Sequence, residues 1–312
     1  MHSKTDELIR TADLLNEVFT VHPPYSVESL GWYYNDNPVG PAAVGYVDDG
    51  ISRSGNYALV PQEFRDASGH SVLLGLGVDL AVASRARGAG TFRCTIESAY
   101  HHGENRGLDA VIGVANTNSA PRMVATLGWR ALDPLPVTLV APSVRGAPME
   151  HHSVTATLLD SPLLDELAGD GFVTSSCSEG VFDPVWTGGY LRWRLGRPGA
   201  QYTLHVSEDL VVVTTVTKIK RFRFALVLKV LARRPFIEPL ALGGIVHSVM
   251  LHHRTPLVVY WGRNPILRMR GIRLPQEKMP SPLAIVLHQL QPTFDEEGFE
   301  LGSFEFLDFD AY

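Results

Sequence analysis

The sequence has few cysteines, no long apolar run and no excess of positive charge. Each of these absences excludes a class of protein or a kind of site. Only two cysteines, Cys94 and Cys177, occur in 312 residues, too few and too far apart for a disulfide framework or a zinc site. No run of about 18 apolar residues is present to span a bilayer, and the first residues predict an amphipathic helix, not a signal peptide. The net charge of -6 gives no support for a nucleic-acid partner. We expect a soluble, cytoplasmic protein that contacts neither membrane nor nucleic acid.

A loop rich in arginine and glycine follows a strand expected over residues 72–82. Residues 85–90 read RARGAG, and a helix is expected to begin near Thr91. Glycines let the backbone approach a ligand with its amides turned inward, and the helix adds the positive end of its dipole. The two arginines supply forked donors suited to a pyrophosphate. The loop therefore predicts an anion site, and the alternative is a surface turn with solvated arginines.

The elements after this loop follow in a specific order. Residues 108–113 read LDAVIG, which favours a strand, residues 116–119 read NTNS, which favours a helix cap, and Gly128 and Trp129 end that helix. The whole stretch from Val78 to Trp129 resembles motifs A and B of the GNAT superfamily of acyl-CoA-dependent N-acyltransferases. The pyrophosphate loop of that superfamily reads Q/R-x-x-G-x-G/A. The resemblance implies acyl-CoA as a co-substrate.

Two registers of this motif are possible. Literal matching selects Arg85, Gly88 and Gly90, whereas the commoner wording V-x-P-x-Y-R-G-x-G-I places the arginine at Arg87 and the first glycine at Gly90, with Phe92 at the last motif position. We prefer the second register, because it also aligns the end of the preceding strand with the backbone that pairs with the pantetheine arm in such enzymes. The residues that the resemblance implies for acyl-CoA binding are Leu80, Val82, Arg85, Arg87, Gly88, Ala89, Gly90, Thr91, Asn116 and Ser119.

The second half of the chain echoes the first. LGWYY at residues 30–34 is echoed by LRWRL at residues 191–195, and VAN at residues 114–116 by GRN at residues 262–264. Repeats of this length suggest tandem domains, and the chain is long enough for two cores. We predict an α/β fold of two tandem GNAT-like domains, each a mixed, mostly antiparallel sheet flanked by helices. They are expected over residues 1–143 and 154–312, joined by a linker, with residues 137–140 as a last strand of the first.

The second copy has no R-x-x-G-x-G loop. Its long apolar region runs into Pro235 and Pro239, which remove two amide donors from the place where amides would face a phosphate. We therefore expect the second domain not to bind coenzyme A, and to shape the acceptor site or the interface between the halves. The alternative is that Gly243 and Gly244 begin a helix that still cradles a phosphate.

Histidine pairs and one basic run invite other interpretations. His247 and His252 are five residues apart, which does not match the i, i+3 or i, i+4 spacing of metal ligands on a helix. We expect hydrogen-bonding or solvated histidines and no metal. The basic run at residues 218–223, KIKRFR, is expected to be a half-exposed strand with a solvated face, the alternative being a patch that steers an anionic acceptor.

Attack on a thioester requires a neutral amine and a proton donor for the leaving thiolate. Asp79, on the strand before the loop, is the candidate base. Many GNAT enzymes carry a tyrosine acid in the motif B helix, but none occurs between Asn116 and Trp129, and Ala125 stands at the usual position. The acid is therefore unassigned, and Asn116 or a residue of the second domain is the candidate for binding a water there.

An aromatic stretch supplies the candidates for the acceptor pocket. Trp32, Tyr33 and Trp193 form either an apolar wall for the substrate or, as the favoured interpretation, packing against the sheet. The leading hypothesis is transfer of an acetyl or short hydroxyacyl group from acyl-CoA to a small-molecule primary amine, such as a nucleotide-linked amino sugar, by direct attack. The alternatives are a non-catalytic CoA-binding module and an aminoacyl transferase of the peptidoglycan type. An oligomer is compatible with each of these three functions.

Overall fold

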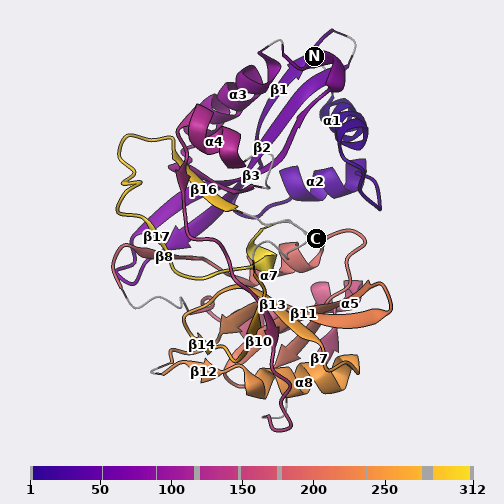
Figure 1. Ribbon diagram of the computed structural model, residues 1–312, viewed down its shortest axis with the longest axis vertical. Helices are drawn as coiled ribbons and strands as arrows, with labels where there is room; N and C mark the ends of the chain where they lie inside the picture. The colour runs from indigo at the N-terminus through magenta and orange to yellow at the C-terminus, as the bar shows by residue number, and fades with distance from the viewer. Residues whose placement is uncertain are drawn as a thin grey trace.

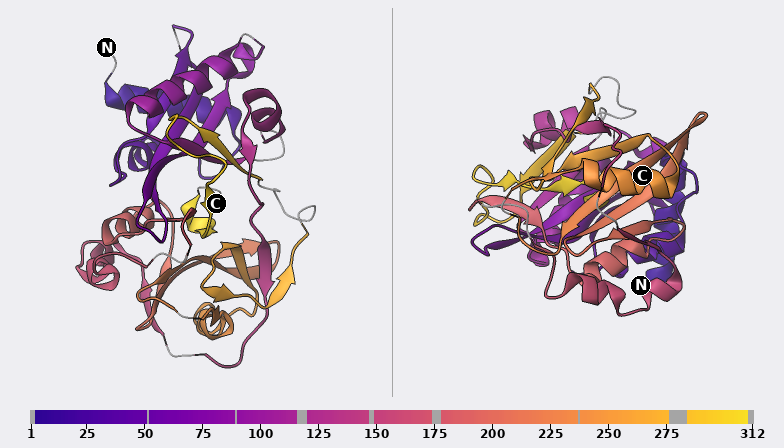
Figure 2. Two further views of the ribbon diagram at one scale, coloured as in Figure 1. Left: turned by 90° about the vertical axis from the view of Figure 1, so that its left-hand side faces the viewer. Right: turned by 90° about the horizontal axis from the view of Figure 1, so that it is seen from below.

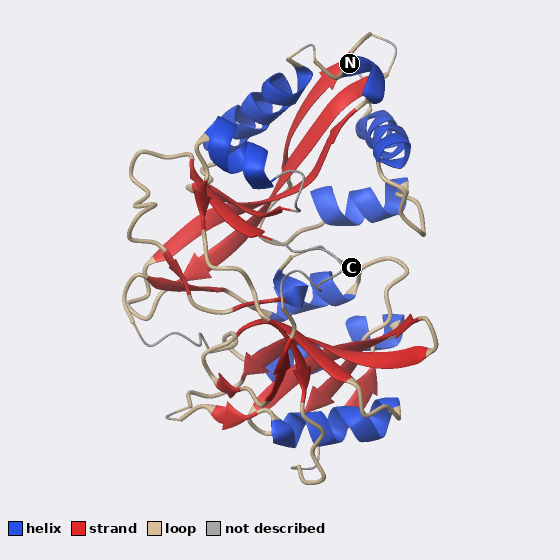
Figure 3. Ribbon diagram, in the orientation of Figure 1, coloured by secondary structure: helices blue, strands red, loops and turns tan. Residues whose placement is uncertain are grey.

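The structure is a computed structural model that describes residues 3–50, 52–88, 90–115, 120–146, 149–173, 178–236, 238–275 and 284–309, without the side chain of Arg122. It contains two curled sheets, one above the other in Figure 1, each with helices packed against it. Figure 3 shows the same layers coloured by secondary structure. Both sheets are mixed and mostly antiparallel, as the sequence predicts.

The upper sheet is built mainly from the first part of the chain. Its strand order is β17-β8-β2-β3-β4-β16-β5, with β1 paired to β2. The strands are β1 (Ala43–Asp48), β2 (Arg53–Arg65), β3 (Ser71–Val82), β4 (Ala110–Ala115), β5 (Arg130–Ala131), β8 (Val181–Pro184), β16 (Ala284–Gln289) and β17 (Glu300–Leu301). The helices are α1 (Lys4–Val18), α2 (Val27–Asn35), the 3-10 turn η1 (Ser84–Ala86), α3 (Thr91–Asn105) and α4 (Ala120–Leu127).

Alternation along β2 sends its side chains to two different helix layers. Ala58 and Val60 belong to the core formed with α1 and α2, whereas Tyr57 and Leu59 belong to the core formed with α3. Helix α3 lies so close to the sheet that a Cβ on Gly45 would stand 2.2 Å from the backbone nitrogen of Ala99. The sheet is therefore covered on both faces (Figure 1).

The lower sheet has the order β15-β6-β13-β11-β10-β9-β7, with β18 paired to β13 and a separate pair of β12 and β14. The strands are β6 (Val137–Val140), β7 (Glu150–Ser153), β9 (Thr203–Val206), β10 (Leu210–Ile219), β11 (Phe222–Ala232), β12 (Leu240–Ala241), β13 (Val258–Arg263), β14 (Leu267–Arg268), β15 (Gly271–Arg273) and β18 (Phe304–Glu305). The helices are α5 (Ala156–Leu159), α6 (Leu163–Ala168), α7 (Gly188–Leu195), α8 (Gly243–His253) and the 3-10 turn η3 (Phe306–Asp308).

The two sheets share a topology and exchange a strand. In the upper sheet β3 pairs parallel with β4 around α3, and in the lower sheet β11 pairs parallel with β13 around α8. The next strand in the upper sheet is β16, from late in the chain, and the next in the lower sheet is β6, from before the expected linker. The expectation that residues 137–140 end the first sheet is therefore wrong. The domain boundaries themselves stay a prediction.

Helices α2 and α7 join the two halves through a symmetric contact. The indole Nε1 of Trp32 donates to the carbonyl oxygen of Trp193 at 2.8 Å, and Nε1 of Trp193 donates to the carbonyl oxygen of Trp32 at 2.9 Å. Their rings are stacked with centroids 5.3 Å apart, and Tyr33 stacks on both. A reciprocal contact of this kind is what a two-fold relation between two similar halves produces.

Candidate active site

A cleft opens in the upper sheet where β3 and β4 stop pairing. Among the described residues, their parallel pairs run from Leu74 with Ala110 to Gly77 with Gly113. Beyond this point β3 contains a bulge, in which Asp79 and Leu80 together oppose Tyr57 on β2. Asp79 has a φ of +54°, and a bulge of this kind bends its strand away from its neighbour. The bend separates the two strands toward their carboxyl ends.

The cleft is a cavity of about 860 Å³. One wall belongs to the core under α3 and includes Tyr57, Phe92 and Met123, and the other belongs to the core under α1 and includes Phe19 and Phe309. The cavity therefore passes between the strands and connects the two faces of the sheet. The described residues that line it are Val18, Phe19, Tyr25, Tyr57, Leu76, Gly77, Val78, Asp79, Leu80, Val82, Ala86, Arg87, Gly88, Gly90, Phe92, Arg93, Gly113, Val114, Ala115, Met123 and Phe309.

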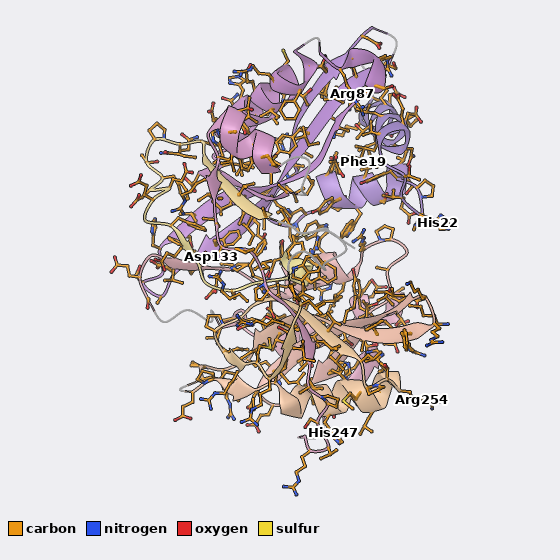
Figure 4. All side chains as sticks on the ribbon, viewed as in Figure 1. Phe19, His22, Arg87, Asp133, His247 and Arg254 are labelled. Atoms are coloured by element: carbon orange, nitrogen blue, oxygen red, sulfur yellow. The ribbon has the colours of Figure 1, made fainter. Side chains whose placement is uncertain are left out.

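The arginine and glycine loop forms one end of this cavity. Gly88 and Gly90 have φ values of +85° and +77°, a region that favours glycine. Gly90 is the N-cap of α3, and no described side chain caps the helix, so the amides of its first turn stay available. Arg87 lies at the upper end of the sheet (Figure 4) and lines the cavity. Its amide donates to the Ser84 carbonyl oxygen, but its guanidinium makes no hydrogen bond or ion pair with any described residue. These donors are placed as an anion at a helix start requires.

Arg85 has a different position from Arg87. Its guanidinium forms ion pairs of 3.0 Å with both Asp49 and Glu17 and donates to the Ser52 hydroxyl at 2.6 Å. The hydrogen bond with Asp49 raises the pKa of Arg85. Arg85 does not line the cavity, so it ties the loop to α1 and to the turn before β2. This placement favours the register in which Arg87 meets the phosphate.

The other residues expected to bind acyl-CoA divide into three groups. Leu80 and Val82 line the cavity along β3. Thr91 begins α3 with a buried side chain and does not line the cavity. Ala89, Asn116 and Ser119 lie outside the described residues, so their proposed roles, including that of Asn116 in catalysis, stay predictions.

Asp79 lines the cavity and is held by a tyrosine that the sequence did not single out. The hydroxyl of Tyr34 on α2 donates to Oδ2 of Asp79 at 2.7 Å. Asn56 donates from Nδ2 to the Tyr34 hydroxyl at 3.3 Å and to the Asp79 carbonyl at 3.2 Å. Burial, reinforced by the Asp79 carboxylate, raises the pKa of Tyr34 well above its ordinary value, so its hydroxyl stays protonated. The Tyr34 hydroxyl is therefore a fixed hydrogen-bond donor to this carboxylate.

The aromatic residues expected in an acceptor pocket do not line the cavity. Trp32, Tyr33 and Trp193 are all buried, and the polar atoms of both tryptophans are used in the contact between α2 and α7. This position favours the packing interpretation. On the side of α1, the described lining of the cavity includes Val18, Phe19 and Tyr25, from the end of α1 and the following loop.

The corresponding place in the lower sheet is filled by the chain itself. Strands β11 and β13 pair only from Ala225 with Val258 to Val227 with Tyr260, and β11 has its own register shift just beyond, before Lys229. There β18 pairs with β13, and the Glu305 carboxylate accepts from the Val230 amide at 3.2 Å. Figure 2 shows this yellow C-terminal segment between the two sheets.

The start of α8 is also covered. A Cβ on Gly146 would stand 2.3 Å from the carbonyl oxygen of Gly244, and the ring nitrogen Nδ1 of His247 lies 3.0 Å from the carbonyl oxygen of Ser143. The segment around residues 143–146 therefore packs where a phosphate would meet this helix. The second half lacks both a free cleft and a free helix start at this place among the described residues.

The described part of the chain contains no candidate metal site and no helix suited to cross a membrane. No group of three or more His, Cys, Asp and Glu side chains there could hold a metal ion. His205 and His253 each place Nε2 2.8 Å from the Thr214 hydroxyl, so they act as hydrogen-bonding groups. Among the described residues, no helix has both the length and the apolar character needed to cross a bilayer.

Comparisons with known proteins support the fold. No protein-family model matches the chain, and no curated protein matches it in sequence. Many solved structures are similar in fold, including the following three. A probable N-acyltransferase from Enterococcus faecalis V583 is 12% identical, with a TM-score of 0.55 over 92% of this chain and 70% of that one. A GCN5-related N-acetyltransferase from Anabaena variabilis is 9% identical, with a TM-score of 0.59 over 93% and 71%. A GCN5-related N-acetyltransferase from Kribbella flavida is 13% identical, with a TM-score of 0.60 over 93% and 70%. The chain therefore has the GNAT fold.

Proposed function

We propose that this chain is an acyl-CoA-dependent N-acyltransferase that works in the cleft between β3 and β4. The observation that carries the proposal is that the open cleft ends at a helix start with free amides, two positive-φ glycines and the unpaired Arg87. A pyrophosphate suits these donors, because they combine oriented amides with a fixed cation. The names of the three similar structures agree with this function.

The pantetheine arm of the co-substrate fits the rest of the cleft. The separation of β3 and β4 leaves backbone donors and acceptors of residues 78–82 facing the cavity side, where an extended chain with two amides can pair with them. The walls are otherwise largely apolar, as the methylene groups of such an arm require. We therefore expect acyl-CoA to lie along β3 with its phosphates at the loop.

The acceptor amine enters from the α1 face in this proposal. Asp79 reaches the cavity from the bulge of β3 and is fixed by the Tyr34 hydroxyl. A carboxylate there attracts an ammonium group and accepts its proton, directly or through a water, before the neutral nitrogen attacks the thioester. The acceptor is a small-molecule amine, with a nucleotide-linked amino sugar as one candidate. Cytoplasmic location, freedom from nucleic acid and membrane, and an oligomeric state stay predictions.

A thiol-release assay tests this function. Purified protein is incubated with acyl-CoA donors of increasing chain length and a panel of primary amines that includes nucleotide amino sugars. The expected result is amine-dependent release of coenzyme A for at least one pair. Asp79→Asn should then lower kcat by about 100-fold, since general-base catalysis contributes factors of this order, with little change in acyl-CoA affinity.

A matched variant distinguishes the loss of a negative charge from the loss of the proposed catalytic base. Asp133→Asn removes an exposed carboxylate that does not line the cavity and should leave kcat unchanged. Binding of acyl-CoA without turnover of any amine would indicate a non-catalytic module. Turnover only with aminoacyl-tRNA would indicate a transferase of the peptidoglycan type. Either result contradicts the proposal.

A further inference from the structure

Tyr57 stands at the point where β3 and β4 separate. Its ring lies across Gly77, which is, among the described residues, the last of β3 to pair with β4. A Cβ on Gly77 would stand 2.1 Å from the Tyr57 hydroxyl oxygen and 2.9 Å from Cζ. Glycine is therefore required at this position for the ring to lie where it does. This contact places the hydroxyl at the closed end of the cleft.

The hydroxyl of Tyr57 is buried and has no hydrogen-bond partner among the described residues. The residue also lines the cavity. Buried polar groups are nearly always paired, so a buried hydroxyl without a partner beside a cavity needs an explanation. Burial raises the pKa of Tyr57 well above its ordinary value, so the group is a hydrogen-bond donor at neutral pH. The missing partner is then expected to be an acceptor carried by the ligand.

The length of the cleft indicates which part of the ligand reaches Tyr57. From Gly77 to Val82, the end of β3, the strand rises about 17 Å at about 3.3 Å per residue. The pantetheine arm, about four residues of extended chain, reaches about 14 Å, which is about one residue short of this length. With the pyrophosphate at Arg87 and the start of α3, the sulfur of the thioester therefore falls near Gly77. Among the described side chains of helix α4, Met123 alone lines this wall, and it has no proton to donate.

We propose that Tyr57 is the proton donor to the leaving sulfur of coenzyme A, an assignment that rests on the proposed function. The amine nitrogen forms a bond to the thioester carbon, and the carbon–sulfur bond breaks with its electron pair moving to sulfur. The Tyr57 hydroxyl donates a hydrogen bond to the developing thiolate and then its proton, which gives the free thiol. The second proton lost by the nitrogen restores the tyrosine, directly or through water, so charge and protons balance.

Tyr57→Phe tests this assignment, because it removes the hydroxyl and keeps the ring that packs on Gly77. We expect kcat to fall about 100-fold, the order of general-acid catalysis, with acetyl-CoA affinity changed by less than about threefold. A second measurement uses acetyl donors whose thiol is made more acidic by fluorine on the second carbon from sulfur. Such a thiolate needs less help from a proton donor, so the loss in Tyr57→Phe should shrink to about tenfold or less.

Two further variants test whether the effect on kcat is specific to Tyr57. Tyr100→Phe removes a hydroxyl that already accepts from Trp129 at 2.7 Å and does not line the cavity, and it should leave kcat unchanged. Tyr25→Phe alters the other cavity-lining tyrosine, on the α1 face, and should not make the rate depend on thiol acidity. Full activity of Tyr57→Phe, or a loss that is the same for every thiol, would overturn the assignment alone. No turnover by the unaltered protein would overturn the proposed function as well.

Discussion

Replacing Arg87 with Ala and Gly90 with Pro together is expected to remove most of the stabilisation of the protein by acetyl-CoA. Arg87 is the loop cation that lines the cavity without a partner. Gly90 has a φ of +77° at the N-cap of α3, which proline cannot adopt because its ring fixes φ near -65°. At a ligand concentration 100 times Kd, the unaltered protein should gain about 2.7 kcal/mol, seen as a rise in Tm. The double variant should gain about 0.4 kcal/mol or less, since losing these phosphate contacts weakens binding by roughly 100-fold or more.

Two control variants distinguish loss of the site from loss of the fold. Arg234→Ala removes an exposed arginine of the second half and should keep the full rise in Tm. Gly69→Pro strains a glycine with a φ of +88° in the turn between β2 and β3, and should lower the Tm of the free protein while leaving the shift by acetyl-CoA intact. A double variant that keeps most of its stabilisation by acetyl-CoA would contradict the location of the pyrophosphate site.

Lys229→Met is expected to destabilise the protein by about 3–5 kcal/mol, the cost of leaving a buried carboxylate without its cation. The ammonium group of Lys229 lies 2.7 Å from Asp308 and 3.1 Å from Glu305, and all three side chains are buried. Burial raises the pKa of Glu305 to about 7 even with the lysine present. Burial alone would lower the pKa of Lys229, but the two carboxylates raise it. The free energy of unfolding is measured by chemical denaturation at pH 7.

The controls for this variant follow from its surroundings. Lys220→Met changes an exposed lysine at the tip of the β10–β11 hairpin and should cost less than about 0.5 kcal/mol. The combination of Lys229→Met with Asp308→Asn and Glu305→Gln should recover part of the loss, because replacing a whole buried ionic group is often close to neutral. A loss below about 1 kcal/mol in Lys229→Met would show that this cluster does not fix the C-terminal segment.

The same segment connects this cluster with the cleft. Glu305 also accepts from the Tyr260 hydroxyl at 2.9 Å and from Asn264 at 3.1 Å, and Trp186 donates to Asp308 at 2.9 Å. A few residues later, Phe309 lines the cavity of the upper sheet. The segment that closes the second half therefore also forms part of the wall of the first. These contacts explain physically how the cleft of the second half is filled.

Local chemistry made the loop predictable from sequence. The residue type and spacing of Gly88 and Gly90 predict a loop whose backbone can come close to a ligand. Both residues have positive φ values, which glycine adopts readily. The alternation along β3 and the apolar run of β4 likewise predict the strands that border the cleft. The sequence allowed two registers and favoured the one with Arg87, and contacts with Glu17 and Asp49, far from the motif, decide the position of Arg85.

Residue type and spacing do not predict contacts between distant segments. Tyr34 meets Asp79 across 45 residues of sequence, and nothing in its local pattern distinguishes it from Tyr33. The position of Tyr57 depends on Gly77 on the neighbouring strand. It also depends on a bulge in β3, which the alternation of apolar residues along β3 does not reveal. The exchange of β6 and β16 depends on pairing partners more than a hundred residues away. Periodicity predicts strands, but it does not predict which sheet each one joins.

Calorimetric titration of the protein with acetyl-CoA tests the central claim most directly, because it counts the sites. An open cleft in the upper sheet and a filled one in the lower sheet predict one molecule of acetyl-CoA bound per chain, whatever the oligomeric state, and none in the Arg87→Ala, Gly90→Pro variant. Two molecules per chain, or no binding by the unaltered protein, would contradict the account.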